Sequence, residues 1–163
     1  MNKKLLVLTI IILLIIGGAF YYWWRSQKNN LGLKVVESGK LTEEELKSFT
    51  DITPRGAFFY SLEQKEEIFN INIFQFWEVN EAKNFFEEIS TINEKAAEKI
   101  KIQKEQIEIG ELSGYIYISN QEPKGCSLIL KEEKIVLTLN TANTDEENIK
   151  NIIKWFTAKY VKS

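Results

Sequence analysis

The sequence predicts an α+β domain behind an N-terminal transmembrane helix, with a mostly antiparallel sheet of about six strands and helices packed on it. Three observations predict this class. The first is an uncharged apolar run over residues 5–24. The second is a series of segments in which apolar and polar residues alternate with the period of a half-buried strand. The third is apolar spacing of three and four residues, which is typical of amphipathic helices. The expected order in the domain is α-ββ-α-ββββ-α.

Residues 5–24 are long enough to cross a bilayer as one helix. The run has no charged residue, and Thr9 is its only polar one. At about 1.5 Å per residue, it spans about 30 Å, the thickness of the hydrocarbon core. Aromatic rings followed by a cation end the run, as is typical of a membrane interface. These interfacial residues are Phe20, Tyr21, Tyr22, Trp23, Trp24 and Arg25. We therefore expect residues 1–25 to anchor the chain in the lipid bilayer.

Other interpretations of this segment stay open. Lys3 and Lys4, the apolar stretch and the small residues ending at Ala19 also fit a signal peptide cleaved after Ala19. Cleavage there would leave a water-exposed N-terminus of five aromatic residues, which disfavours this interpretation. A buried core helix is a further alternative.

The basic residues around the run predict its orientation. Lys3 and Lys4 lie on one side, and Arg25 and Lys28 lie on the other. A basic start at the extreme N-terminus usually keeps that end in the cytoplasm. We therefore expect a single-pass protein of the cell membrane with its domain outside the cytoplasm. The abundance of Lys, Asn and Ile beside only two Arg suggests a prokaryotic source.

Residues 26–40 are expected to be a linker, and residues 41–163 one domain. Residues 1–28 hold four basic and no acidic side chains, and the whole chain has a formal net charge of −2. The rest of the chain therefore carries −6. An acidic domain repels phosphate backbones, so we expect no nucleic-acid partner.

The domain is expected to begin with a short helix and a strand pair. Thr42 and Glu45 have the spacing of a capping box, and the helix they start ends before Pro54. Residues 55–63 and 66–77 alternate as an antiparallel pair. The alternation slips at the end of the second strand, which predicts either a bulge or a strand end buried on both faces.

A longer helix and four strands follow. The helix is expected to begin at Asn80, whose side chain can cap it, and to continue toward Ile100. Its apolar stripe is Ala82, Phe85, Phe86, Ile89 and Ile92. The four strands, separated by turn residues, are 102–109, 114–119, 126–131 and 134–141.

The last element is the clearest helix of the domain. Thr144 and Glu147 have the spacing of a second capping box. The apolar side chains behind them form one stripe, which predicts that the helix packs on the sheet. The stripe consists of Ile149, Ile152, Ile153, Phe156 and Tyr160.

Part of this pattern resembles a known family. A helix over residues 81–86, an Ile-Gly turn at 109–110 running into 114–117, an aliphatic hairpin and a terminal helix are similar to the Mog1/PsbP-like α/β sandwiches. The resemblance covers residues 55–161 and rests on element order rather than on a functional signature. It implies an accessory or binding module more than an enzyme, and it assigns no site residues.

The residue types argue against catalysis. The chain has no His and a single Cys, Cys126, so the usual bases, nucleophile pairs and zinc ligands are missing from the sequence. Cys126 begins an apolar strand and is best explained as a small buried hydrophobe. An acid-only hydrolase would need two convergent carboxylates, which no motif predicts. We expect no catalytic residues, no metal site and no cofactor.

The best lead to function is a surplus of aromatic residues around the first strand pair, beside Arg55, the only Arg of the domain. Most of these rings are expected in the core, and some line a ligand or partner surface. The candidates for that surface are Arg55, Phe58, Tyr60, Phe76 and Trp77. We expect a membrane-anchored binding module that contacts another membrane or envelope protein. The alternative is a carrier or sensor of a lipid or other apolar molecule.

Overall fold

The computed structural model describes residues 31–47, 52–100, 102–122 and 124–161. A compact unit spans Leu33–Ser163. The predicted anchor, residues 5–24, lies outside the described residues. Among the described residues, no helix is long and apolar enough to cross a membrane.

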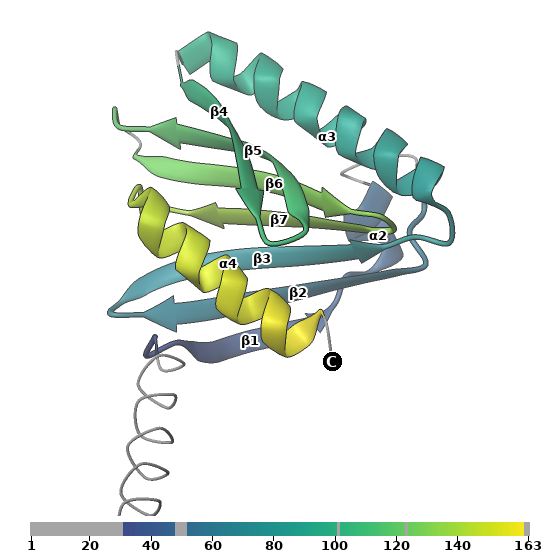
Figure 1. Cartoon of the computed structure of the whole chain (residues 1–163), viewed down its shortest axis with the longest axis horizontal. Coiled ribbons are helices and arrows are strands. Elements are labelled where there is room, and N and C mark those ends of the chain that lie inside the picture. Colours follow the sequence, from purple (N-terminus) through teal and green to yellow (C-terminus); the bar gives the residue numbers. More distant parts are fainter. Residues whose placement is uncertain (1–30, 48–51, 101, 123, 162–163) are drawn as a thin grey trace, which may run out of the picture. The chain divides into compact units, whose positions relative to one another are not determined.

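The described residues form a seven-stranded sheet in which all neighbouring strands are antiparallel (Figure 1). In spatial order the strands are β1 (Lys34–Lys40), β2 (Gly56–Gln64), β3 (Glu67–Gln75), β7 (Ile135–Thr141), β6 (Gly125–Glu132), β5 (Leu112–Ser119) and β4 (Gln103–Ile109). The described helices are α2 (Glu43–Lys47), α3 (Val79–Ile100) and α4 (Glu146–Tyr160). These elements confirm the α+β class, and the six predicted strands all begin and end within two residues of their predicted bounds.

The seventh strand, β1, lies where the sequence predicts a linker. It pairs with β2 at the edge of the sheet, and its register shifts between Val35 and Glu37. Almost all of its side chains are exposed, so it shows no alternation of apolar and polar residues. Edge strands are held largely by backbone hydrogen bonds to one neighbour, and hydropathy therefore does not reveal this one.

The sheet separates two cores. Ile73 and Phe74 are consecutive on β3, and their side chains are only 3% and 1% exposed. Successive side chains of a strand point to opposite faces, so both faces of the sheet must be covered. The pairing of β3 with β2 and β7 is continuous. The strand end is therefore buried on both sides, and the alternative of a bulge is wrong.

Helix α4 covers one face, called here the α4 face (Figure 1). Its stripe packs on the inward side chains of the central strands, as the sequence predicts. The ring of Tyr60 on β2 lies 5.0 Å from the ring of Phe156 and 5.0 Å from that of Tyr160. The buried side chains that α4 contributes are Ile149, Ile152, Ile153 and Phe156.

Helix α3 packs on the opposite face, called here the α3 face, over β5, β6 and β7. Leu46 of α2 packs against the same core as α3, and Ala57 of β2 belongs to that core. The α3 stripe is buried from Ala82 to Ile89, but Ile92 is half exposed. Beside α3 this face is open at Asn70 of β3, whose side chain is exposed.

The three helix starts differ in how well the sequence predicts them. The Thr42 N–H donates to Glu45 Oε2 at 2.7 Å, and the Glu45 N–H donates to Thr42 Oγ1 at 3.3 Å, so the first capping box is confirmed. At α4 the predicted cap, Thr144, is wrong. Asp145 Oδ1 accepts from the N–H groups of Glu147 and Asn148, both at 3.1 Å, because it lies one residue closer to them.

The predicted cap of α3, Asn80, is also wrong. The helix begins at Val79, so Asn80 is already helical. Instead, Glu81 Oε2 accepts from the N–H groups of Trp77 and Glu78, both at 3.2 Å. A carboxylate in the first turn satisfies these free donors from inside the helix.

Candidate functional site

The predicted partner surface is partly assembled at one end of the sheet. Trp77 follows β3 and is 63% exposed, and the Arg55 guanidinium carbon lies 4.3 Å from the centre of its ring. Val79, two residues further on, is half exposed. We call these three residues, Arg55, Trp77 and Val79, the Trp77 patch.

The other predicted surface residues lie elsewhere. Phe76 is buried on the α3 face, with its ring 5.1 Å from that of Phe85, so it belongs to the core and not to a surface. Phe58 and Tyr60 occupy alternate positions of β2 and are half buried. Tyr60 is engaged by α4 rather than by solvent. The alternation along β2 and β3 sends these rings to different faces.

A second surface lies on the open part of the α3 face and was not predicted. Asn70 of β3 pairs with Ser61 of β2 on one side and with Asn140 of β7 on the other. Asn140 in turn pairs with Ser127 of β6. Directly cross-strand residues share a face, so these four side chains form a row across four strands. The members of this row are far apart in the sequence, and only strand pairing brings them together.

A cavity of about 200 Å³ lies between this row and α3. Its lining contains no charged side chain, and it combines amide and hydroxyl groups of the sheet with apolar groups of α3. The lining residues are Asn72, Phe74, Ile89, Ile92, Asn93, Ser127, Thr138 and Asn140. A wider, more open hollow of about 700 Å³ adjoins it and shares Ser127 and Asn140. We call the two together the amide cleft.

Some side-chain hydrogen-bond donors and acceptors in the amide cleft make no hydrogen bond to a described residue. Ser61 Oγ donates to Asn70 Oδ1 at 2.9 Å, and Asn72 Nδ2 donates to Thr138 Oγ1 at 3.3 Å. The side-chain amide of Asn140 makes no hydrogen bond to any described residue. Each Asn can donate two hydrogen bonds and accept two, so the cleft floor presents free donors and acceptors of both kinds.

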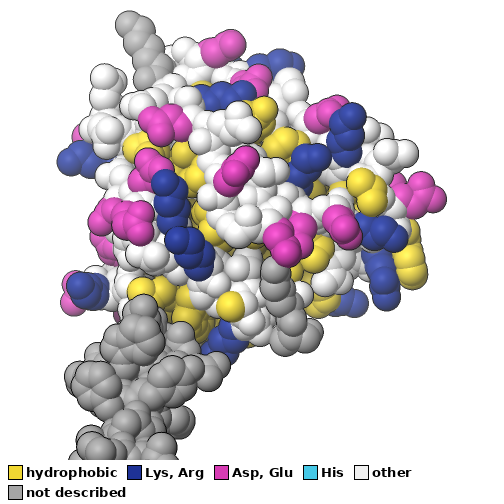
Figure 2. Space-filling model, viewed as in Figure 1, with side chains coloured by type: hydrophobic (Ala, Val, Ile, Leu, Met, Phe, Trp, Pro, Cys, Tyr) yellow, Lys and Arg dark blue, Asp and Glu magenta, His cyan; other side chains and the backbone are white. Residues whose placement is uncertain are grey.

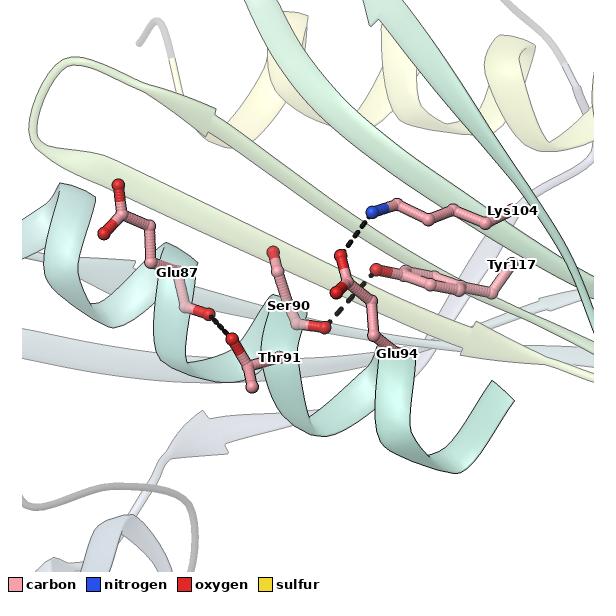
Figure 3. A network of polar contacts seen from close by, with 6 residues as sticks. All are labelled: Glu87, Ser90, Thr91, Glu94, Lys104 and Tyr117. Carbon is pink, nitrogen blue, oxygen red and sulfur yellow. Dashed lines mark hydrogen bonds and ion pairs between the residues drawn. The ribbon is translucent and has the colours of Figure 1, made fainter. Parts of the chain in front are cut away.

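A polar cluster fixes the wall of the amide cleft (Figure 3). The Lys104 ammonium group of β4 forms an ion pair with Glu94 of α3, and the Tyr117 hydroxyl donates to the carbonyl oxygen of Ser90 at 3.5 Å. Burial and the nearby Glu94 raise the pKa of Tyr117 to about 12, so its hydroxyl stays protonated. The Ser90 hydroxyl is buried with no partner among the described residues. These contacts hold the second half of α3 on β4 and β5.

Cys126 is placed as the sequence predicts. It lies on the α4 face within the core, and burial, followed by the charge of Glu146, raises the pKa of its thiol to about 12. The thiolate is therefore disfavoured, and this side chain packs rather than reacts. Among the described residues, no group of three or more Asp, Glu, Cys or His side chains converges as metal ligands do.

The visible charges do not form a field of one sign. On the side of the domain that carries α4, basic and acidic side chains are interspersed (Figure 2). Ion pairs on the helices, such as Lys150 with Glu146, belong to this mixed surface. This face therefore shows no concentration of charge of one sign (Figure 2).

No protein-family model matches the sequence, and no curated protein matches it. The resemblance to Mog1/PsbP-like sandwiches therefore stays a prediction.

Proposed function

We propose that this protein is a non-catalytic binding module that residues 5–24 anchor in the cell membrane, with the domain outside the cytoplasm. Its partner is another membrane or envelope protein, and the Trp77 patch is the contact surface. The observation that carries the proposal is the exposure of Trp77 with Arg55 against its ring.

The composition of the Trp77 patch supports a protein partner. Trp and Arg are the residue types that contribute most to binding energy at protein interfaces. The guanidinium group over the indole already holds both side chains in one arrangement, so less conformational entropy is lost on binding. The exposed side chains of Trp77 and Val79 together offer apolar area that a partner can bury.

The position of the Trp77 patch supports the same proposal. The chain enters the domain beside Lys34, which pairs with Glu63. Gly56, which pairs with Gln75, lies at the other end of β2, about 23 Å away by strand rise. Trp77 follows Gln75, so the patch and the entry of the chain lie at opposite ends of the sheet. The Trp77 patch is therefore separated from the start of the described domain by the length of a strand.

The alternative, carriage of an apolar molecule, has less support. A site for such a ligand is lined mostly by apolar groups and encloses about 300 Å³ or more. The cavity beside α3 has about 200 Å³, and five of its eight lining residues are Asn, Ser or Thr. The adjoining hollow of about 700 Å³ is large enough, but it is more open to solvent and its lining includes Glu66, Glu67 and Lys124. Burying an apolar ligand against them would leave amide groups without hydrogen bonds.

Site-specific crosslinking in native membranes tests the proposal. A photoreactive phenylalanine analogue at position 77 of the full chain is expected to give one discrete crosslinked protein, and Arg55→Ala is expected to reduce its yield. The matched control places the same analogue at Lys154, an exposed position on α4. Equal crosslinking at positions 77 and 154, or none at 77, contradicts the Trp77 patch as the contact surface.

A further inference from the structure

We infer that the amide cleft binds a neutral polyhydroxylated ligand, of the chemical class of a carbohydrate. This site is separate from the Trp77 patch and does not depend on the proposed function. It lies on the α3 face over β3, β7 and β6 and is bounded on one side by α3.

The chemistry of the lining selects the ligand class. The cavity beside α3 has no charged side chain in its lining, so a charged ligand finds no counter-charge there. The charged residues that line the adjoining hollow, Glu66, Glu67 and Lys124, are of both signs. A fully apolar ligand would displace water from the amides of Asn93 and Asn140 without replacing its hydrogen bonds, which costs free energy. A neutral ligand with many hydrogen-bonding groups brings no uncompensated charge into the cleft and can bond to the amides.

Hydroxyl groups match the amide row. A hydroxyl both donates and accepts, and so does a side-chain amide. The oxygen of Asn140 can accept from one hydroxyl while its nitrogen donates to the next. Asn93 on α3 faces the same cavity and, like Asn140, makes no hydrogen bond to a described residue. Donors and acceptors therefore approach the ligand from both the floor and the wall.

The apolar part of the lining fits the other surface of a sugar ring. Ile89, Ile92 and Phe74 line the cavity beside the amides. The C–H groups of a pyranose form an apolar patch that can pack on such side chains. This contact explains why Ile92, although it belongs to the apolar stripe of α3, is left half exposed at the edge of the cleft.

A peptide fits the amide cleft less well. Extended peptides are commonly recognised by adding a strand to a free sheet edge, where backbone groups are available. The floor of the cleft is the face of β3, β7 and β6, which are interior strands with neighbours on both sides. Recognition there depends on side chains, and the side chains present are suited to hydroxyl groups.

Ligand-observed saturation-transfer NMR on the full chain in lipid nanodiscs tests this inference. The probes are maltotetraose, cellotetraose and chitotetraose at millimolar concentration. At least one of them is expected to receive saturation, and Asn140→Leu is expected to weaken its binding about tenfold, the loss of roughly one good hydrogen bond. Asn84→Leu, at an exposed position of α3 outside the cleft, is the matched control and is expected to bind like wild type.

Controls distinguish loss of binding from loss of folding. Circular dichroism establishes that each variant is folded, and Ser127→Ala, a smaller change in the same row, replaces Asn140→Leu if that variant does not fold. Absence of binding by all three oligosaccharides overturns the inference. So does unchanged binding by the folded cleft variant, or displacement of the sugar from the cleft by a neutral Ser-Gly-Asn peptide that binds more tightly. None of these results bears on crosslinking at position 77.

Discussion

The ring centroids of Phe74 and Phe85 lie 4.6 Å apart, and this contact joins the end of β3 to α3. Both side chains are fully buried. We predict that Phe74→Ala lowers the free energy of unfolding by about 3–5 kcal/mol, because it removes a large buried side chain and leaves a cavity. Denaturant unfolding measures the loss. Phe59→Ala, at a half-buried position of β2, is the control, and an equal loss there contradicts the assignment of Phe74 to the core.

We predict that a substitution in the turn between β2 and β3 can raise the stability of the domain. Lys65 and Glu66 both have positive φ, at 50° and 70°, a conformation that is costly for residues with a Cβ. Glu66→Gly is expected to stabilise the domain by about 1 kcal/mol in thermal or denaturant unfolding. Glu67→Gly, one residue later in β3, is expected to do the opposite, because glycine weakens a strand. Destabilisation by Glu66→Gly would contradict the observed turn.

The capping box of α2 predicts a pH effect. The backbone N–H and then the hydroxyl of Thr42 hold the pKa of the Glu45 carboxyl below its ordinary value of 4.5. A lowered pKa in the folded state means that this contribution to stability is present above the ordinary value and is lost as the pH falls through the lowered one. Carbon-detected NMR titration of the Glu45 carboxyl in wild type and in Thr42→Ala measures the difference. We expect the pKa to rise only part of the way toward 4.5 in the variant, because alanine removes the hydroxyl but keeps the backbone N–H of residue 42.

The thiol of Cys126 is predicted to be unreactive while the domain is folded. Its burial and its pKa of about 12 both oppose attack by the thiolate at pH 8. Labelling with a thiol reagent is expected to occur only when denaturant is added. A Cys126→Ala variant that also carries Ser38→Cys on the exposed strand β1 is expected to react at once. Rapid labelling of native Cys126 would show that the strand opens under native conditions.

The anchor is predicted to remain in the mature protein. Mass spectrometry of the membrane fraction is expected to find residues 1–25 attached, whereas an N-terminus at Phe20 means cleavage. Leu13→Lys, near the centre of the predicted helix, is expected to cost about 2.5–3.5 kcal/mol of insertion, and Trp24→Lys at the interface much less. Equal tolerance at positions 13 and 24 contradicts a membrane-spanning helix.

The sequence predicts those elements whose side chains carry the pattern. Alternation locates the strand pair β2 and β3, and the apolar stripe locates α4, because buried faces impose a period on the chain. Turn residues delimit the four later strands. Strand β1 shows no such period, because its side chains are exposed and it is held by backbone pairing with β2. Caps are predicted less well, since Asp145 and Thr144 are chemically similar neighbours and only the final geometry selects one.

The candidate sites also differ in whether a local sequence pattern can reveal them. The sequence draws attention to Arg55 because it is the only Arg of the domain, and the structure places it against Trp77. That they form a partner surface stays a prediction. The amide cleft is not predictable, because Asn70, Asn140 and Ser127 are ordinary polar residues of separate strands. Their proximity depends on the placement of β7 between β3 and β6, a feature of topology that no local pattern encodes.

The place of β1 has a mechanical consequence. The chain enters the sheet through this edge strand, and Trp77 lies at the far end of the strands. A pulling force between the two points acts along the strands, while antiparallel hydrogen bonds lie across them. All the bonds between β1 and β2 are then loaded together in shear instead of breaking one after another from an end. The register shift between Val35 and Glu37 interrupts this pairing close to the point where the force enters, so fewer bonds share the load there.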